Sequence, residues 1–360
     1  MIRRPALTLT WTAVFLTGLA CGPKNETPAP ASVAAKGPLA GSLKVVCWDD
    51  YLTPAVVADF EKQFGVRLEI EFLNNNEEAI ARLEKGEVWD VWAPSDYAVH
   101  MAKEKGLLAP LDLAAIPNQT QVGRRFRNAS YDQEFRYSVP FYWGMSGWGY
   151  EVAAFPQKPD SWSWVFDEAR RKRLGGKIRL LDDVRETMGI ALIYLGLDPN
   201  STDPQHLAAA RDLLIAAKSG VTFDSDVYDE ALATGEAQLA HGWTDVLSRL
   251  AAGDNRFAVT LPREGVMLWI DNWAIPAAST KKETAQVLIN YLLNPAVAAK
   301  LATDNQCATT LPEVRPLLAP EVARNLVELP EDVPFHVFRF LGDEGTARME
   351  AAWEAVKAAR

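Results

Sequence analysis

Aromatic residues stand beside acidic ones at several places in this 360-residue sequence, in most cases where a short apolar stretch ends and in one case inside such a stretch. The four clearest cases are Trp48-Asp49-Asp50-Tyr51, Ser95-Asp96-Tyr97, Trp243-Thr244-Asp245 and Trp269-Ile270-Asp271. Aromatic faces attract cations and pack against methylene groups, and carboxylates pair with ammonium groups. These residue types together indicate a binding site for an aliphatic amine.

A further acidic run, Asp182-Asp183-Val184-Arg185-Glu186, has two interpretations. It follows another apolar stretch, so it could add two acids to the same kind of site. Asp183 with Glu186 three residues later also matches a capping box at the start of a helix. Asp96 and Asp245 fit helix caps as well, because an aspartate that follows a strand often caps the next helix. The residues alone leave both interpretations open.

Asp271 is the acid that is hardest to explain without a ligand. It lies inside Met267-Leu-Trp-Ile-Asp-Asn-Trp-Ala-Ile-Pro276, a stretch too apolar to solvate a charge. A buried carboxylate without a partner is strongly destabilising. Trp269 is two residues away and shares the same face of an extended strand. We therefore expect Asp271 and Trp269 to face a bound cation together.

Alternating strand and helix patterns indicate how these residues are positioned. In the first part of the chain, the pattern predicts strands at 43–48, 66–73 and 88–94 and helices at 54–65, 76–85 and 97–105. Two extended segments with glycines at 144, 147 and 149 follow between 137 and 150. The alternation then restarts, with strands at 177–181, 220–223, 237–243 and 257–261 and helices at 184–195, 204–217, 228–234 and 244–252. A long apolar strand at 267–276 and helices near 281–302 and 343–358 close the chain.

Two such blocks predict an α/β protein with two lobes, each built on a doubly wound, mostly parallel sheet. The apolar strand at 267–276 is expected to cross back to the first lobe. In open α/β sheets, ligands bind outside the carboxyl ends of the strands. The acid and aromatic pairs would therefore meet in a cleft between the lobes.

The composition excludes several classes of protein. A hydrophobic content of 48% is enough to build cores, and 37 basic against 47 acidic residues give a net charge of −10, which disfavours nucleic acid and anionic membranes as partners. Only Cys21, Cys47 and Cys307 are present, which excludes a disulfide scaffold and a multi-cysteine metal site. A single disulfide between Cys47 and Cys307 stays open.

Motifs of catalysis and cofactor binding were not found. The sequence has no nucleophile elbow, no phosphate loop, no dinucleotide fingerprint and no zinc-helix motif, and its four histidines lack ligand spacing. We therefore expect no enzyme, no cofactor and no metal. The alternative is an extracytoplasmic enzyme that uses Asp183 and Glu186 as an acid/base pair.

The N-terminus has the layout of an export signal. Arg3 and Arg4 precede an apolar run, and small residues lead to Cys21, so 1–20 is predicted to be a signal peptide. A cysteine at that point resembles the lipidation site of bacterial lipoproteins, which predicts a lipid anchor on Cys21. Residues 21–41 are rich in proline and alanine, which predicts an extended tether. Removal of the signal leaves 35 basic against 47 acidic residues.

A set of ordered motifs resembles the periplasmic spermidine/putrescine-binding proteins of ABC importers. The motifs are Trp48-Asp-Asp-Tyr51, Asp90-Val-Trp-Ala-Pro-Ser95-Asp-Tyr97, Tyr137-Ser-Val-Pro140 with Trp143-Gly144, Asp182-Asp183-x-Arg-Glu186, Pro262-Arg-Glu-Gly265 with Trp269-x-Asp271, Ala274-Ile-Pro276 and Leu292-Leu-Asn-Pro295. The resemblance covers about 42–360. It implies a two-lobed type II periplasmic-binding-protein fold, with lobe 1 at 42–144 plus 270–313 and lobe 2 at 145–269 plus 314–360.

The resemblance also implies which residues contact the ligand. The aromatic contacts carried over are Trp48, Tyr51, Tyr97, Trp243 and Trp269. The acids and hydroxyls carried over are Asp50, Ser95, Asp183, Glu186 and Asp271. Asp245 resembles an acid of putrescine binders, whereas Tyr97, Asp183 and Trp269 match the spermidine type.

Three positions depart from the family pattern. Cys307 falls where the family has a tyrosine of the cleft, and Arg339 falls near a glutamine of spermidine binders. Asp49 replaces a small hydroxyl residue and could offset the charge of Arg339. An arginine facing the cleft would make one end of the site less favourable for an ammonium group, so the ligand would be shorter or carry an acceptor.

The predicted function is that of a monomeric, anchored, extracytoplasmic protein that captures spermidine or putrescine and delivers it to an ABC permease. Two alternatives use the same fold. The protein could bind another organic cation or zwitterion, such as agmatine or a thiamine-like molecule, or it could be a polyamine sensor that presents its closed form to a receptor.

Overall fold

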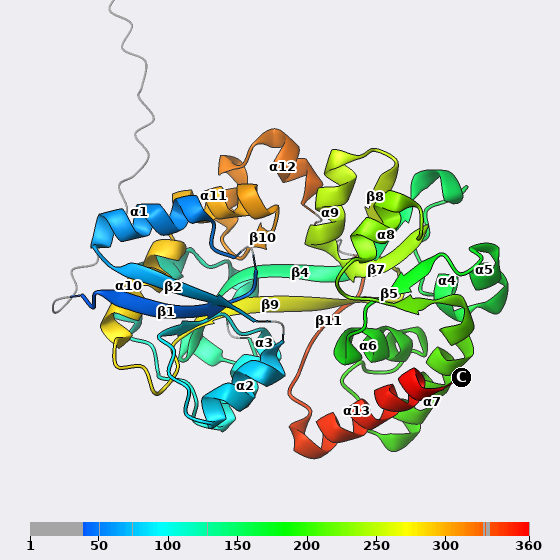
Figure 1. Ribbon diagram of the computed structural model, residues 1–360, viewed down its shortest axis with the longest axis horizontal. Helices are drawn as coiled ribbons and strands as arrows, with labels where there is room; N and C mark the ends of the chain where they lie inside the picture. The colour runs from blue at the N-terminus through cyan, green and yellow to red at the C-terminus, as the bar shows by residue number, and fades with distance from the viewer. Residues whose placement is uncertain are drawn as a thin grey trace, which may run out of the picture.

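A computed structural model describes residues 39–49, 51–73, 75–127, 129–326, 328 and 332–359 (Figure 1). The predicted signal peptide at 1–20, the lipidation site Cys21, the predicted tether up to residue 38 and the site residue Asp50 lie outside these ranges. No helix of the described residues is long and apolar enough to cross a membrane. The described residues also contain no group of three or more histidine, cysteine or acidic side chains that could hold a metal ion.

The first half of the chain forms three parallel strands with flanking helices. The strands are β1 (Ser42–Cys47), β2 (Arg67–Phe72) and β3 (Val91–Trp92), and the helices are α1 (Pro54–Phe64), α2 (Asn76–Glu84) and α3 (Asp96–Glu104). β1 pairs with β2 on one side and β3 on the other. Thr53 occupies the N-cap position of α1, and Pro54 is its first helical residue. Gly65 ends the helix in the left-handed conformation, with a φ of 68° that favours glycine. This local chemistry matches the predicted helix at 54–65.

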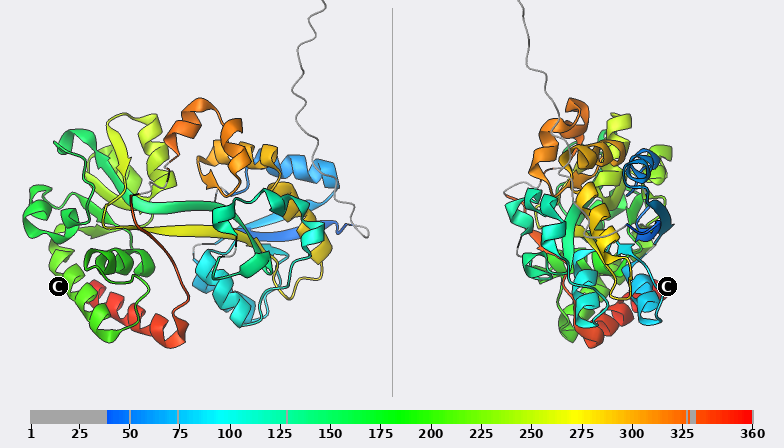
Figure 2. Two further views of the ribbon diagram at one scale, coloured as in Figure 1. Left: turned by 180° about the vertical axis from the view of Figure 1, so that it is seen from behind. Right: turned by 90° about the vertical axis from the view of Figure 1, so that its left-hand side faces the viewer.

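The second half repeats the same construction. Its strands are β5 (Ile178–Leu180), β6 (Thr222–Phe223), β7 (Leu239–Trp243) and β8 (Phe257–Thr260). Its helices are α4 (Ser163–Phe166), α5 (Glu168–Arg173), α6 (Val184–Tyr194), α7 (Pro204–Ala217), α8 (Tyr228–Thr234), α9 (Thr244–Gly253) and the C-terminal α13 (Gly342–Ala358). β5 pairs in parallel with both β6 and β7. α13 lies beside α6 and α7, as both faces of the molecule show (Figures 1 and 2).

Two long strands run through both halves. β4 (Ser138–Glu151) and β9 (Val266–Ala274) pair with each other in antiparallel register. β9 also pairs with β3, while β4 pairs with β7 and β8, so the two sheets are joined (Figure 1). The two extended segments predicted between 137 and 150 are therefore one strand, with a register shift between Pro140 and Tyr142.

The C-terminal part of the chain returns to both halves. Its elements are α10 (Lys282–Leu292), α11 (Pro295–Asn305), β10 (Ala308–Thr309), α12 (Pro320–Asn325) and β11 (Phe335–Val337). The helix predicted near 281–302 is thus two helices, because Asn294 caps a new one by accepting the N–H of Ala296 at 3.0 Å. β10 pairs with β4 and β11 with β9, so the chain crosses between the halves again before α13.

The mixed α/β class and the mostly parallel sheets predicted from the sequence are confirmed. The predicted lobe boundaries stay a prediction. Those at 144/145 and 269/270 fall inside β4 and β9, which continue through them. Five tryptophans are fully buried and belong to the core, namely Trp89, Trp92, Trp148, Trp162 and Trp273. The rings that remain accessible include Trp48, Trp243 and Trp269.

Candidate ligand-binding site

Asp271 lies in the middle of β9 with two hydroxyl groups directed at its carboxylate. The hydroxyl of Tyr51, which follows β1, donates to one oxygen, and the hydroxyl of Ser95 donates to the other at 2.6 Å. Ser95 also forms a single backbone bridge with Asp271. Among the described residues Asp271 has no ion-pair partner, although it is only 6% exposed. Burial raises the pKa of Asp271 to about 6, against the lowering effect of the two hydroxyls.

Asn76, the first residue of α2, connects Ser95 to Tyr97. Its side-chain N–H groups donate to the Ser95 hydroxyl at 3.1 Å and to the Tyr97 hydroxyl at 3.2 Å. The Tyr97 hydroxyl in turn donates to Glu77 at 3.0 Å. Asp96, between the two hydroxyl residues, is fully buried, and Ser95 occupies the N-cap position of α3. The helix-cap interpretation of Asp96 is therefore wrong.

The acidic run before α6 divides into a cap and a buried acid. Asp183 accepts the backbone N–H of Arg185 at 2.8 Å and of Glu186 at 2.9 Å, so its capping interpretation is right. Glu186 is 2% exposed, and one of its oxygens has no hydrogen-bond partner among the residues that the structure describes. Burial and the nearby Asp183 raise the pKa of Glu186 to about 8. His241, 3.9 Å away, does not supply a counter-charge, since burial lowers its pKa to about 3.

Arg185 links the two halves through aromatic rings. Its guanidinium carbon lies 5.3 Å from the ring centre of Tyr97 on α3 and 5.1 Å from that of Phe338, which follows β11. Its terminal nitrogen donates to the Asn200 side chain at 2.9 Å and to the backbone oxygen of Arg339 at 3.0 Å. Cation–π contacts of a buried guanidinium are favourable, so Arg185 stabilises the contact of α6 with α3.

The indole ring of Trp269, on β9, packs against Gly144 of the neighbouring strand β4. The two residues are register partners, and a Cβ added to Gly144 would lie 2.3 Å from the indole ring. Glycine at 144 is thus what lets the ring lie against the strand. Within the part of the chain that the structure describes, the indole N–H groups of Trp269 and Trp48 are buried without a hydrogen-bond partner. Trp243 ends β7 and occupies the N-cap position of α9, so Asp245, two residues on, is not the helix cap.

Cys307 and Asp245 form a hydrogen-bonded pair. The Cys307 thiol donates to Asp245 over 3.4 Å, and Arg249 lies 3.6 Å from the same oxygen. Asp245 interacts electrostatically with both Asp271 and Tyr51, which places this pair close to the β9 carboxylate. Cys47 and Cys307 are both free and buried, so they do not form a disulfide in this structure.

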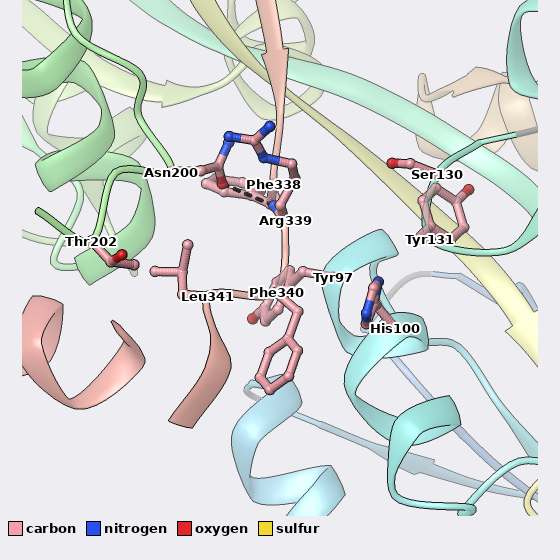
Figure 3. A pocket seen from close by; sticks show the side chains of 10 residues that line it. All are labelled: Tyr97, His100, Ser130, Tyr131, Asn200, Thr202, Phe338, Arg339, Phe340 and Leu341. Carbon is pink, nitrogen blue, oxygen red and sulfur yellow. Dashed lines mark hydrogen bonds between the residues drawn. The ribbon is translucent and has the colours of Figure 1, made fainter. Parts of the chain in front are cut away.

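The guanidinium of Arg339 is paired with an acid outside the groups described above. Its guanidinium pairs with Asp198, its side chain is 54% exposed, and its backbone N–H donates to Asn200 at 2.9 Å. It lines a cavity of about 360 Å³ that also contains Tyr97, with Phe338 between the two halves (Figure 3). Asp49 is exposed at the end of β1.

Comparison with known proteins identifies the family of this chain. Residues 55–328 match the model of the bacterial extracellular solute-binding proteins. The chain belongs to this family. The putrescine/cadaverine-binding protein of Pseudomonas aeruginosa is 32% identical over 302 residues, or 80% of this chain and 85% of the relative. The spermidine/putrescine-binding periplasmic protein of Escherichia coli is 30% identical and covers 87% of this chain and 90% of its own length.

A solved structure supports the fold of this solute-binding protein. It comes from Listeria monocytogenes and is described, provisionally, as a spermidine/putrescine ABC transporter. It is 30% identical, covers 89% of this chain and 100% of its own, and has a TM-score of 0.82. The type II periplasmic-binding-protein fold expected from the sequence is therefore confirmed.

The solute-binding protein brings most of the predicted site residues into three neighbouring groups. The groups are Tyr51, Ser95, Tyr97 and Asp271; Asp183, Glu186 and Trp243; and Asp245 with Cys307. Electrostatic interactions of Asp271 with Asp245, and of Tyr97 with Asp183, connect the first group with the other two. Sequence reasoning missed Asn76, Arg185 and His241. Only Arg185 had a signal, as the basic residue inside an acidic motif.

Proposed function

We propose that this solute-binding protein captures a polyamine, spermidine or putrescine, and delivers it to an ABC permease. Asp271 carries the proposal. It is a buried carboxylate that two hydroxyls orient and that no cation neutralises among the described residues, with the accessible ring of Trp269 on the same face of β9. A buried carboxylate of this kind is stabilised when an ammonium group enters and pairs with it.

The other groups suit the rest of such a ligand. Glu186 offers a second buried carboxylate, with one oxygen that has no hydrogen-bond partner among the described residues. Asp245 offers a partly buried one, of which one oxygen contacts Cys307 and Arg249. Trp48 and Trp243 add aromatic faces against which methylene groups can pack. The relatives whose names specify spermidine, putrescine or cadaverine are similar over most of this chain, which supports the same class of ligand.

Calorimetric titration with spermidine, putrescine, agmatine and thiamine tests the proposal. We expect at least one of the first two amines to bind more tightly than agmatine and thiamine. Tighter binding of agmatine or thiamine would favour another organic cation as the natural ligand. No detectable binding of any of the four would refute the proposal.

We propose further that the protein is a monomeric lipoprotein attached through Cys21. The small residues before Cys21 and the proline-rich segment behind it support an anchor with a tether. Cys21→Ser should move the protein from the membrane fraction to the soluble fraction of the cells that export it. A wild-type protein that is already soluble in that assay would contradict the anchor. Sedimentation of the exported domain should give the mass of one chain.

A further inference from the structure

Asn76 stands behind the proposed ligand-binding groups and contacts two of them at once. It is 3% exposed at the start of α2, while its neighbour Asn75 is exposed and caps that helix by accepting the N–H of Glu78 at 2.7 Å. The two adjacent asparagines therefore have different tasks.

The orientation of the Asn76 amide follows from its partners. Its side-chain oxygen accepts the backbone N–H of Ser95 at 3.3 Å, and a backbone N–H can only donate. The amide nitrogen must then face the two hydroxyls, of Ser95 at 3.1 Å and of Tyr97 at 3.2 Å. A flipped amide would set its N–H groups against the Ser95 N–H, and the two hydroxyls could bond its oxygen only by turning their protons away from Asp271 and Glu77.

Each hydroxyl has one proton, so accepting from Asn76 decides where that proton goes. The Ser95 hydroxyl donates to Asp271 at 2.6 Å, and the Tyr97 hydroxyl donates to Glu77 at 3.0 Å. We propose that Asn76 is a positioning residue of the binding site, which holds both hydroxyls as donors to carboxylates and so keeps Asp271 oriented and charged for an incoming ammonium group. This inference rests on the proposed capture of a polyamine.

Asn76→Asp tests the inference, because it keeps the shape of the side chain and replaces the donor by an acceptor. The Ser95 hydroxyl can then donate to residue 76 instead of Asp271. We expect putrescine binding at pH 8 to weaken by about tenfold or more, as for the loss of a hydrogen bond to a charged group. Charge alone would act the other way, since an added carboxylate near a cation site strengthens cation binding.

Asn75→Asp is the matched control, with the same added charge one residue away at a position that only needs to accept. It should bind putrescine within about twofold of wild type. Asn76→Ala should weaken binding less than Asn76→Asp, because the freed Ser95 hydroxyl still has Asp271 as its best acceptor. The opposite order, or an Asn76→Asp protein within threefold of wild type, would overturn the inference and leave Asn76 a packing residue.

A second measurement is independent of the ligand. Carbon-13 NMR of labelled aspartate carboxyls, with Asp271 assigned through Asp271→Asn, follows the titration of Asp271 in the empty protein. Loss of the Ser95 donor should raise the pKa of Asp271 in Asn76→Asp above its value in Asn75→Asp. Equal pKa values in the two variants would refute the role of Asn76. A wild type that binds no polyamine would refute the proposed function and leave this second test standing.

Discussion

Asp271 gathers its partners from distant parts of the chain. Tyr51 comes from the loop behind β1 and Ser95 from the start of α3, and both donate to the carboxylate. Hydroxyl donors stabilise a carboxylate without neutralising it. The residue thus combines burial with a negative charge that no described side chain neutralises, which is the condition for pairing with a cationic ligand.

Substitution at this carboxylate should weaken binding directly. Asp271→Ala and Trp269→Ala should each reduce putrescine affinity by at least about 2 kcal/mol, since one removes the partner of a desolvated charge and the other an aromatic anchor. Isothermal titration calorimetry measures both. Asp59→Ala, which removes an exposed acid paired with Lys300, is the control and should leave affinity unchanged. Unchanged affinity in Asp271→Ala would show that the ligand lies elsewhere.

Polyamine affinity should rise with pH. The pKa of Asp271 is about 6 and that of Glu186 about 8, both raised by burial, so these acids are increasingly ionised between pH 5.5 and 8.5. The terminal ammonium groups of the ligand stay charged in that range because primary alkylammonium groups have a pKa of about 10.4. Calorimetric titrations at a series of pH values should show polyamine affinity increasing from pH 5.5 to pH 8.5. Glu186→Gln should make the increase smaller at the upper end of this range. Affinity that falls with rising pH would contradict this.

The acidic residues of the candidate site could be predicted from the sequence, whereas the residues that contact them could not. Asp271 was predictable because one charge stands inside an apolar strand. Asn76 is one of three consecutive asparagines at 74–76, and its contacts to Ser95 and Tyr97 lie about 20 residues further along the chain. His241 is buried beside Glu186 only because β7 and α6 lie together, which no local pattern encodes.

At the scale of elements, two of the helices that begin beside the site have a side-chain cap, whereas α3 and α9 begin without one. Asp183 starts α6, and Asn75 starts α2. The bounds of both helices were predicted to within one residue, whereas the short helices α4, α5 and α12 were not predicted. The strands between 137 and 150 were not resolved as one, because Pro140 and three glycines interrupt the alternating pattern that marks a continuous strand.

Arg185 connects α6 with α3, so we expect its substitution to affect ligand binding differently from the substitution of a residue that contacts the ligand. Arg185→Met keeps much of the packing volume but removes the cation between Tyr97 and Phe338 and the hydrogen bond to Asn200. We expect spermidine and putrescine to lose affinity by the same factor, of about five- to tenfold, because the contact joins the two halves and not protein and ligand. Calorimetry with both amines measures the ratio. A loss confined to one amine would make Arg185 a specificity residue.

The whole molecule consists of two halves that share their central strands. β4 belongs to both sheets, β9 pairs along it in antiparallel register, and β11 adds a further crossing (Figure 1). The two-lobed architecture was predictable from the repeated strand and helix pattern. The shared strands were not, because their length is visible only once their partners β3, β7 and β8 are known.

Shared strands also bear on how the protein unfolds. A cut between Gly144 and Met145 would leave each half with part of β4 and incomplete hydrogen bonding, so neither half is a complete folding unit. Differential scanning calorimetry should therefore show one heat-absorption peak, which a saturating polyamine shifts upward as a whole. Two peaks that respond separately to ligand would mean that the halves melt independently. Although the chain has two lobes, we expect it to be a single cooperative unit.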